Sequence, residues 1–125
     1  MKAGRELDAL IAEKVMGWTP CYHDDDVVVA WRDENGYEKF FTDPTQSDNE
    51  WSPSTDMNDA WVVVERLRES KTFSLHDIWD EEDIIMFNAT FQHNDTYHVV
   101  NYESYANTAP LAICLASLKA VGVVV

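Results

Sequence analysis

Histidines, cysteines and clustered carboxylates are the residues of this chain whose chemistry could support catalysis or metal binding. Cys21 is followed two positions later by His23, but side chains so close in sequence seldom form the ion pair that activates a thiolate. The run from His23 to Asp26 offers four possible metal ligands. Adjacent side chains rarely point at one ion, however, and the run lacks the spaced acidic residues of a calcium loop. We therefore interpret it as a solvated acidic loop.

A second possible metal site lies around the dipeptide Asn94-Asp95, which we expect to be a hairpin turn flanked by His93 and His98. Both histidines would then face the apolar side of the sheet, but no third ligand follows at a suitable spacing. We expect His98 to be a hydrogen-bonded residue of the sheet face. No phosphate-binding glycine loop or Gly-x-Ser-x-Gly motif occurs, and no catalytic pair stands out among the 23 acidic residues. The sequence therefore predicts no catalytic residue, no metal and no cofactor.

Aromatic and arginine side chains are the better candidates for binding a ligand or partner. Trp18, Tyr22 and Trp51 fall at expected loop or cap positions, where an aromatic ring can reach outward. Trp51 has two open interpretations: an anchor that folds its loop onto the core, or an exposed contact residue. An anionic ligand would require local convergence of arginines. The candidate binding residues are Trp18, Tyr22, Arg32, Trp51, Arg66 and Arg68.

Composition limits the classes of protein to consider. The 125 residues suit one domain, and a hydrophobic content of 46% excludes a disordered acidic tail. A net charge of −14, with nine scattered basic residues, disfavours direct binding of nucleic acid. The acidic surface serves solubility, or it mimics the charge of nucleic acid to block a host protein. No apolar run is long enough for a membrane helix, and no signal peptide is visible, so we expect a cytoplasmic protein.

The two cysteines are not expected to form a disulfide, because the compartment is reducing and Cys114 falls on the buried face of a helix. That helix follows Asn107 and carries its own start and stop signals. Thr108 can cap the first turn, Pro110 suits that turn, and Gly122 stands where a left-handed cap residue ends a helix. The intervening residues are apolar most of the way round, which predicts a helix at the centre of the fold.

The remaining elements are predicted from periodicity and turn signals. Arg32 should pair with Glu38 across a three-residue loop ending at Gly36, because a two-residue turn would oppose like charges. The later hairpin has one apolar and one wetter face. The chain is therefore an α+β layered sandwich, a mainly antiparallel sheet packed by three helices. The expected segments are a helix over 5–16, strands over 27–31 and 37–41, a helix after 54–56 burying Met57, Ala60, Trp61, Val64 and Leu67, a strand over 73–79, and a hairpin over 84–92 and 96–105.

Three blocks, GRELDALIAEKVMGW (4–18), STDMNDAWVVVERL (54–67) and TAPLAICLASLKAVG (108–122), together resemble the phage ABA sandwich domain family. These are small phage and prophage proteins, mostly of unassigned function. The resemblance implies an α/β sandwich of phage origin over residues 1–125 and supplies no catalytic motif. The region 22–51 departs most from the family pattern, so a specific role is expected there or on the wetter face of the sheet.

These observations favour a non-enzymatic phage accessory protein that acts by binding in the host cytoplasm. The first hypothesis is counter-defence by capture of a small metabolite or signalling nucleotide in a pocket between subunits. The alternatives are an acidic inhibitor of a host protein and, least favoured, a hydrolase assembled from distant residues. The apolar end Val123-Val124-Val125 could form an edge strand, pack across a homo-oligomer interface or mark a truncation.

Overall fold

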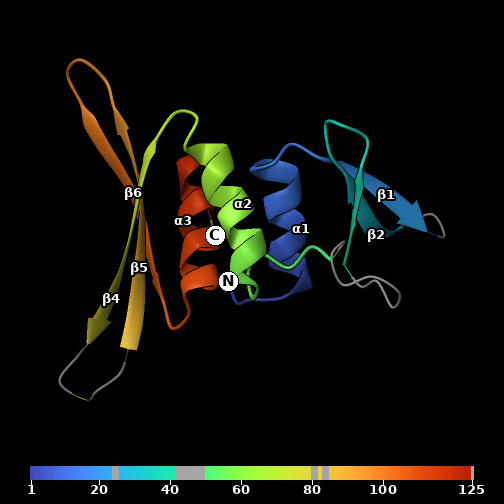
Figure 1. The fold of residues 1–125 in the computed structure, drawn as a ribbon, viewed down its shortest axis with the longest axis horizontal. Helices are drawn as coiled ribbons and strands as arrows, with labels where there is room; N and C mark the ends of the chain where they lie inside the picture. The colour runs from blue at the N-terminus through green and yellow to red at the C-terminus, as the bar shows by residue number, and fades with distance from the viewer. Residues whose placement is uncertain (24–25, 42–49, 80–81, 83–84, 125) are drawn as a thin grey trace.

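The protein folds into a layer of three helices between two small antiparallel sheets (Figure 1). The computed structural model describes residues 1–23, 26–41, 50–79, 82 and 85–124. The predicted α+β layered sandwich is confirmed, but the described strands form two sheets, on opposite sides of the helices, where one was expected. The elements are α1 (Arg5–Lys14), β1 (Thr19–His23), β2 (Val27–Arg32), β3 (Glu38–Phe40), α2 (Met57–Leu67), β4 (Thr72–Trp79), β5 (Ile85–Asn94), β6 (Val99–Ala106) and α3 (Ala109–Ala120).

Helix α3 is central, as its apolar sequence predicts. It packs against β5 and β6 on one side and against α2 on the other (Figure 1). Thr108 accepts a hydrogen bond from the N–H of Leu111 at 3.4 Å, Pro110 lies in the first turn, and Gly122 has a φ of 82° just after the helix. The helix is enclosed on most sides. Its buried residues are Ala112, Ile113, Cys114, Ala116, Ser117 and Leu118.

The β4–β6 sheet has strand order β4-β5-β6 and lies against α3. The predicted turn at Asn94-Asp95 is wrong: the turn is centred two residues later, and the strand pairing is shifted by four residues, because Asn94 pairs with Val99. The carboxylate of Asp95 accepts the N–H groups of Tyr97 and His98 at 2.8 and 2.6 Å, which places residues 95–98 in the turn. An even shift preserves which residues share a face, so Ala89 and Phe91 are buried as expected.

His98 is the residue most affected by this shift. It leaves the sheet face predicted for it, and its side chain is 74% exposed in the turn. Its Nδ1 lies 3.6 Å from Oδ1 of Asp95.

The β1–β3 sheet contains a strand that the sequence analysis missed. Strand β1 pairs with β2 and is an edge strand, which is where a residue without an N–H, here Pro20, is tolerated. Its register shifts between Cys21 and Tyr22. This irregularity and the proline conceal the alternation that would identify a strand.

The β2–β3 hairpin has the predicted loop. Arg32 pairs with Glu38, and their side chains form an ion pair of 3.1 Å. The N–H of Asp33 donates to the carbonyl of Tyr37 at 2.9 Å, which closes the three-residue loop 34–36. Gly36 has a φ of 86°, the left-handed conformation that glycine adopts most readily.

Replacing Gly36 with alanine should lower the free energy of unfolding by about 1 kcal/mol, because a Cβ is strained at this φ. No atom lies within 4 Å of the position that this Cβ would occupy, so the effect isolates the backbone conformation. Urea denaturation measures it. Gly36→Asn is the control, since asparagine enters this conformation more easily and should lose less. Equal stability of all three proteins would contradict the left-handed conformation of Gly36.

The segment after the undescribed residues 42–49 is held between α1 and α2. Asp8 on α1 is only 4% exposed, and its Oδ1 accepts the N–H of Ser54 at 2.8 Å. The indole Nε1 of Trp51 donates to the main-chain carbonyl of Asp8 at 3.0 Å. Asp59 on α2 accepts the N–H of Ser52 at 2.8 Å. These contacts fix the chain as it enters α2.

Candidate functional site

Two of the predicted binding residues are part of the core. Trp18 is 7% exposed and Trp51 is 1% exposed, and their ring centroids are 4.5 Å apart. Of the two interpretations of Trp51, the structure confirms the one in which it anchors its loop to the core, because its ring is enclosed and its N–H is hydrogen-bonded to α1. Neither indole presents a surface to an external ligand.

The other predicted residues lie on the surface but in different places. Tyr22 is 61% exposed on β1, and Arg32 is paired with Glu38 at the end of β2. Arg66 and Arg68 both belong to the C-terminal end of α2, but they line different grooves. The groove at Arg66 has a volume of about 390 Å³ and is mostly acidic, with Met16, Glu34, Val62, Glu65 and Glu69 as the other lining residues. Convergence of three arginines is therefore not the basis of a site.

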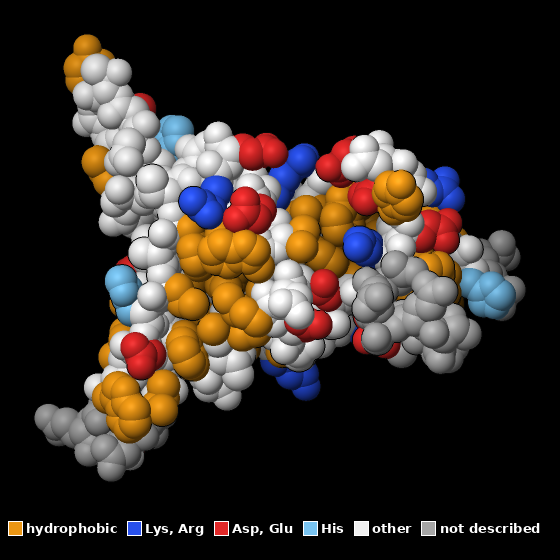
Figure 2. Space-filling model, viewed as in Figure 1, with side chains coloured by type: hydrophobic (Ala, Val, Ile, Leu, Met, Phe, Trp, Pro, Cys, Tyr) orange, Lys and Arg blue, Asp and Glu red, His pale blue; other side chains and the backbone are white. Residues whose placement is uncertain are grey.

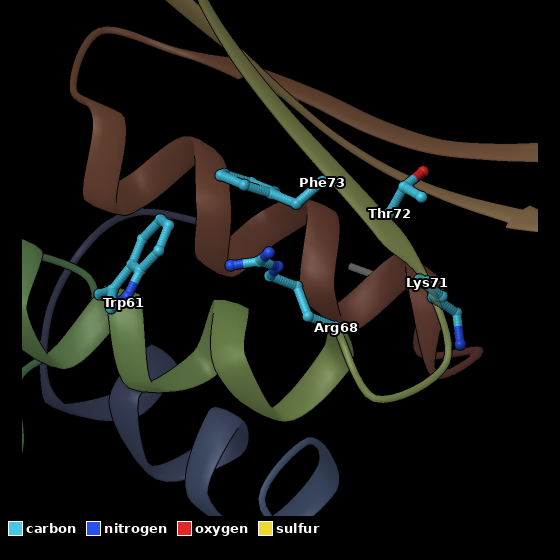
Figure 3. Close-up of a pocket in the computed structure, with 5 residues that line it drawn as sticks. All are labelled: Trp61, Arg68, Lys71, Thr72 and Phe73. Atoms are coloured by element: carbon cyan, nitrogen blue, oxygen red, sulfur yellow. The ribbon is translucent and has the colours of Figure 1, made fainter.

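Arg68 belongs to a groove between α2 and the start of β4, which we call the α2–β4 groove (Figure 3). Its volume is about 500 Å³, within the range of small-molecule sites. It is lined by Trp61, Arg68, Lys71, Thr72 and Phe73. An adjoining groove of about 320 Å³ shares Arg68, Lys71 and Thr72 and continues to Glu69, Ser70, Gln92 and Asn94.

The aromatic side chains of the groove come from both of its walls. Trp61 rises from α2 and Phe73 extends from β4, and their ring centroids are 6.1 Å apart in an edge-on arrangement. Phe73 in turn packs against the buried Phe91, with centroids 5.0 Å apart. Phe73 is thus fixed from behind, whereas Trp61 keeps 43% of its surface exposed.

The exposure of Trp61 corrects the sequence prediction, which placed it and Met57 on the buried face of α2. Helix α2 buries an aliphatic stripe of Ala60, Val63, Val64 and Leu67, and Met57 is also exposed. The buried face therefore keeps Ala60, Val64 and Leu67 of the prediction and has Val63 in place of Met57 and Trp61. Hydrophobic side chains accordingly gather over the helix layer on the face drawn in Figure 2, with charged side chains of both signs above them.

The two cations of the groove differ in their surroundings. The guanidinium of Arg68 lies in the space between Trp61 and Phe73 in Figure 3, and its Nη1 is 3.3 Å from Oε1 of Glu65. Lys71 extends away from the two rings, and its Nζ donates to Oγ of Ser70 at 3.3 Å. Across the ranges that the structure describes, Lys71 has no carboxylate partner within ion-pair distance. One end of the groove is therefore aromatic and charge-balanced, and the other end is positive.

The remaining reactive groups do not form a second site. Both cysteines are free, and burial, followed by the charge of Asp8, raises the pKa of the Cys114 thiol well above its ordinary value. Among the residues described, no three histidine, cysteine or acidic side chains are grouped to hold a metal ion. No described helix has the length and apolar character needed to cross a membrane.

Sequence comparison identifies the family. Neither the curated proteins nor the solved structures contain a significant match to this chain. The model of the Phage ABA sandwich domain, in contrast, matches residues 9–118, from within α1 almost to the end of α3. This match covers most of the chain and includes both described sheets, all of α2 and parts of α1 and α3. The protein therefore belongs to the phage ABA sandwich domain family.

Proposed function

We propose that this phage protein acts by binding a small, planar, negatively charged molecule in the α2–β4 groove. The observation that carries the proposal is the placement of an exposed indole, a buttressed phenyl ring and a guanidinium within one groove. A flat ligand stacks on such rings, and a cation held next to them attracts an anion.

The charge of the protein makes this groove distinctive. The chain carries a net charge of −14, so an anion meets repulsion over much of the surface. Arg68 and Lys71 are two of only nine basic residues, and they line the same groove. The two cations attract an anion within the groove, whereas the acidic surface around it repels one. A small anion fits within the attractive region, but an extended polyanion would also meet the repulsive surface.

Binding without turnover agrees with the side chains that line the groove. Among the described residues that line it, none carries a carboxylate, imidazole or thiol, which are the groups most used for acid–base and nucleophilic catalysis. Membership of a phage family adds the setting: the protein would act in the cytoplasm of the infected host, where sequestering a metabolite or signalling nucleotide counters a host response. The groove lies within one chain, so this proposal needs no subunit interface.

The dye anilinonaphthalene sulfonate, a planar aromatic anion, tests the groove. We expect its fluorescence to rise on binding, and Trp61→Ala to weaken the affinity about tenfold or more by removing the stacking surface. Trp79→Ala is the matched control, because Trp79 is 61% exposed on β4 but does not line the groove. Equal binding by both variants and the unaltered protein would place the dye elsewhere and overturn the proposal.

A further inference from the structure

The two ends of the α2–β4 groove differ in chemistry, and from this difference we infer that its ligand is a nucleoside phosphate; the inference rests on the proposed function. At the aromatic end, Trp61 and Phe73 offer ring surfaces, and the charge of Arg68 is balanced by Glu65. Such an end suits an uncharged heteroaromatic ring. The bases of nucleotides are rings of this kind, and every base can stack on an aromatic side chain or on a guanidinium plane.

The positive end lies apart from the rings. Trp61 lies in the second turn of α2, six residues before the last residue of the helix, Leu67. Lys71 lies beyond the end of α2 and extends further away from both rings (Figure 3). A ligand that uses both ends must therefore carry its anion on a spacer, not directly on the ring.

The groups around Lys71 indicate what the spacer is. Ser70, whose Oγ accepts from Lys71, and Thr72 precede and follow Lys71 in the chain. Asn94 and Gln92, whose Nε2 donates to Oδ1 of Asn101, add amides along the adjoining groove. Hydroxyl and amide groups donate to and accept from sugar hydroxyls. A ribose between a base and a phosphate provides such a spacer, whereas an aromatic carboxylate or sulfonate holds its charge close to the ring.

The surrounding carboxylates restrict the ligand to a short one. Glu65 on α2 forms an ion pair with Arg68, and Glu69, in the turn after α2, lines the adjoining groove. A nucleic-acid strand needs a continuous basic track for its phosphates. Among the described residues of the groove, Lys71 is the one cation without a carboxylate partner, and Glu69 lies two positions before it, which fits a mononucleotide.

Calorimetric titration with adenosine monophosphate, adenosine and inorganic phosphate tests this inference at one low salt concentration. Adenosine monophosphate should bind at least about fivefold more tightly than adenosine, through attraction between its phosphate and Lys71. Lys71→Met should abolish that difference and leave adenosine binding unchanged, whereas Trp61→Ala should weaken both ligands. Lys14→Met is the matched control, since Lys14 is an exposed lysine paired with Glu13 on α1.

The outcomes separate this inference from the proposed function. If dye binding depends on Trp61 but adenosine monophosphate does not compete, the groove is a binding site and its ligand is not a nucleotide. Equal affinity for adenosine and its monophosphate, unaffected by Lys71→Met, also overturns the inference. If a single-stranded oligonucleotide bound more tightly than adenosine monophosphate, the conclusion that the groove takes a small ligand would be wrong. If neither the dye nor the nucleotide shows Trp61-dependent binding, the proposed function itself fails.

Discussion

Trp51→Ala is expected to lower the free energy of unfolding by about 3–5 kcal/mol, the usual cost of removing a fully buried large aromatic side chain. Trp51 is 1% exposed, its ring lies 4.5 Å from that of Trp18, and its N–H is bonded to α1. The substitution therefore creates a cavity and also leaves the carbonyl of Asp8 without this donor. Urea denaturation followed by circular dichroism measures the loss without depending on tryptophan fluorescence.

Trp51→Phe separates these two contributions. Phenylalanine keeps most of the buried ring but cannot donate to the carbonyl of Asp8, so the loss should be clearly smaller than for alanine. Trp79→Ala controls for removing an indole from a surface position. A small loss for Trp51→Ala, similar to that for Trp79→Ala, would show that Trp51 is not a core residue.

Asp8→Ala is expected to destabilise the fold by about 1–3 kcal/mol, because the buried N–H of Ser54 loses its acceptor. Asp8→Asn retains an oxygen that can accept the same bond and removes the buried charge. We therefore expect it to be much less harmful than alanine at neutral pH. Thermal or urea unfolding of the two variants side by side provides the comparison. Equal losses for both would mean that the acceptor oxygen is not what matters at this position.

The charge of Asp8 also gives stability a characteristic dependence on pH. Burial raises the pKa of this carboxyl above 3.8, and the hydrogen bonds from Ser54 offset the rise only in part. The folded state then binds the proton more tightly than the unfolded state does. The stabilisation from protonating Asp8 is complete below its unfolded pKa and is lost as pH rises through its folded pKa.

Asp8→Asn removes this contribution. The stability of the unaltered protein relative to Asp8→Asn should therefore decline as the pH rises from about 3.8, the ordinary pKa of the carboxyl, through its raised folded-state pKa. Asp59, whose pKa burial also raises, is present in both proteins, and its negative charge adds to the raised pKa of Asp8. A difference that stays constant with pH would contradict the raised pKa of Asp8.

Features that depend on neighbouring residues were predictable from the sequence. The caps of α3 and the three-residue loop before β3 rest on local rules, namely a hydroxyl at a helix start, glycine at a positive φ and opposite charges across a hairpin. Thr108, Gly36 and the pair Arg32–Glu38 each satisfy such a rule within a few residues.

Features that depend on contacts between distant segments could not be predicted from the sequence. Asp8 looks like a solvent-facing helix residue until Ser54, 46 positions later, brings an N–H to it. Trp61 has the spacing of a core residue, and only the packing of α2 on α3 turns it toward Phe73. The sequence names Arg68 as a candidate binding residue, but Lys71 and Phe73 join it in one groove only because the turn after α2 reverses the chain.

The separation of the two sheets by the helix layer has a consequence for how such proteins can diverge. No strand of the β1–β3 sheet is hydrogen-bonded to a strand of the β4–β6 sheet. An insertion or deletion in the loop of the β2–β3 hairpin changes strand register only within its own sheet. The pairing of β4, β5 and β6 does not depend on that register. The strand register of one sheet can therefore change while that of the other is retained.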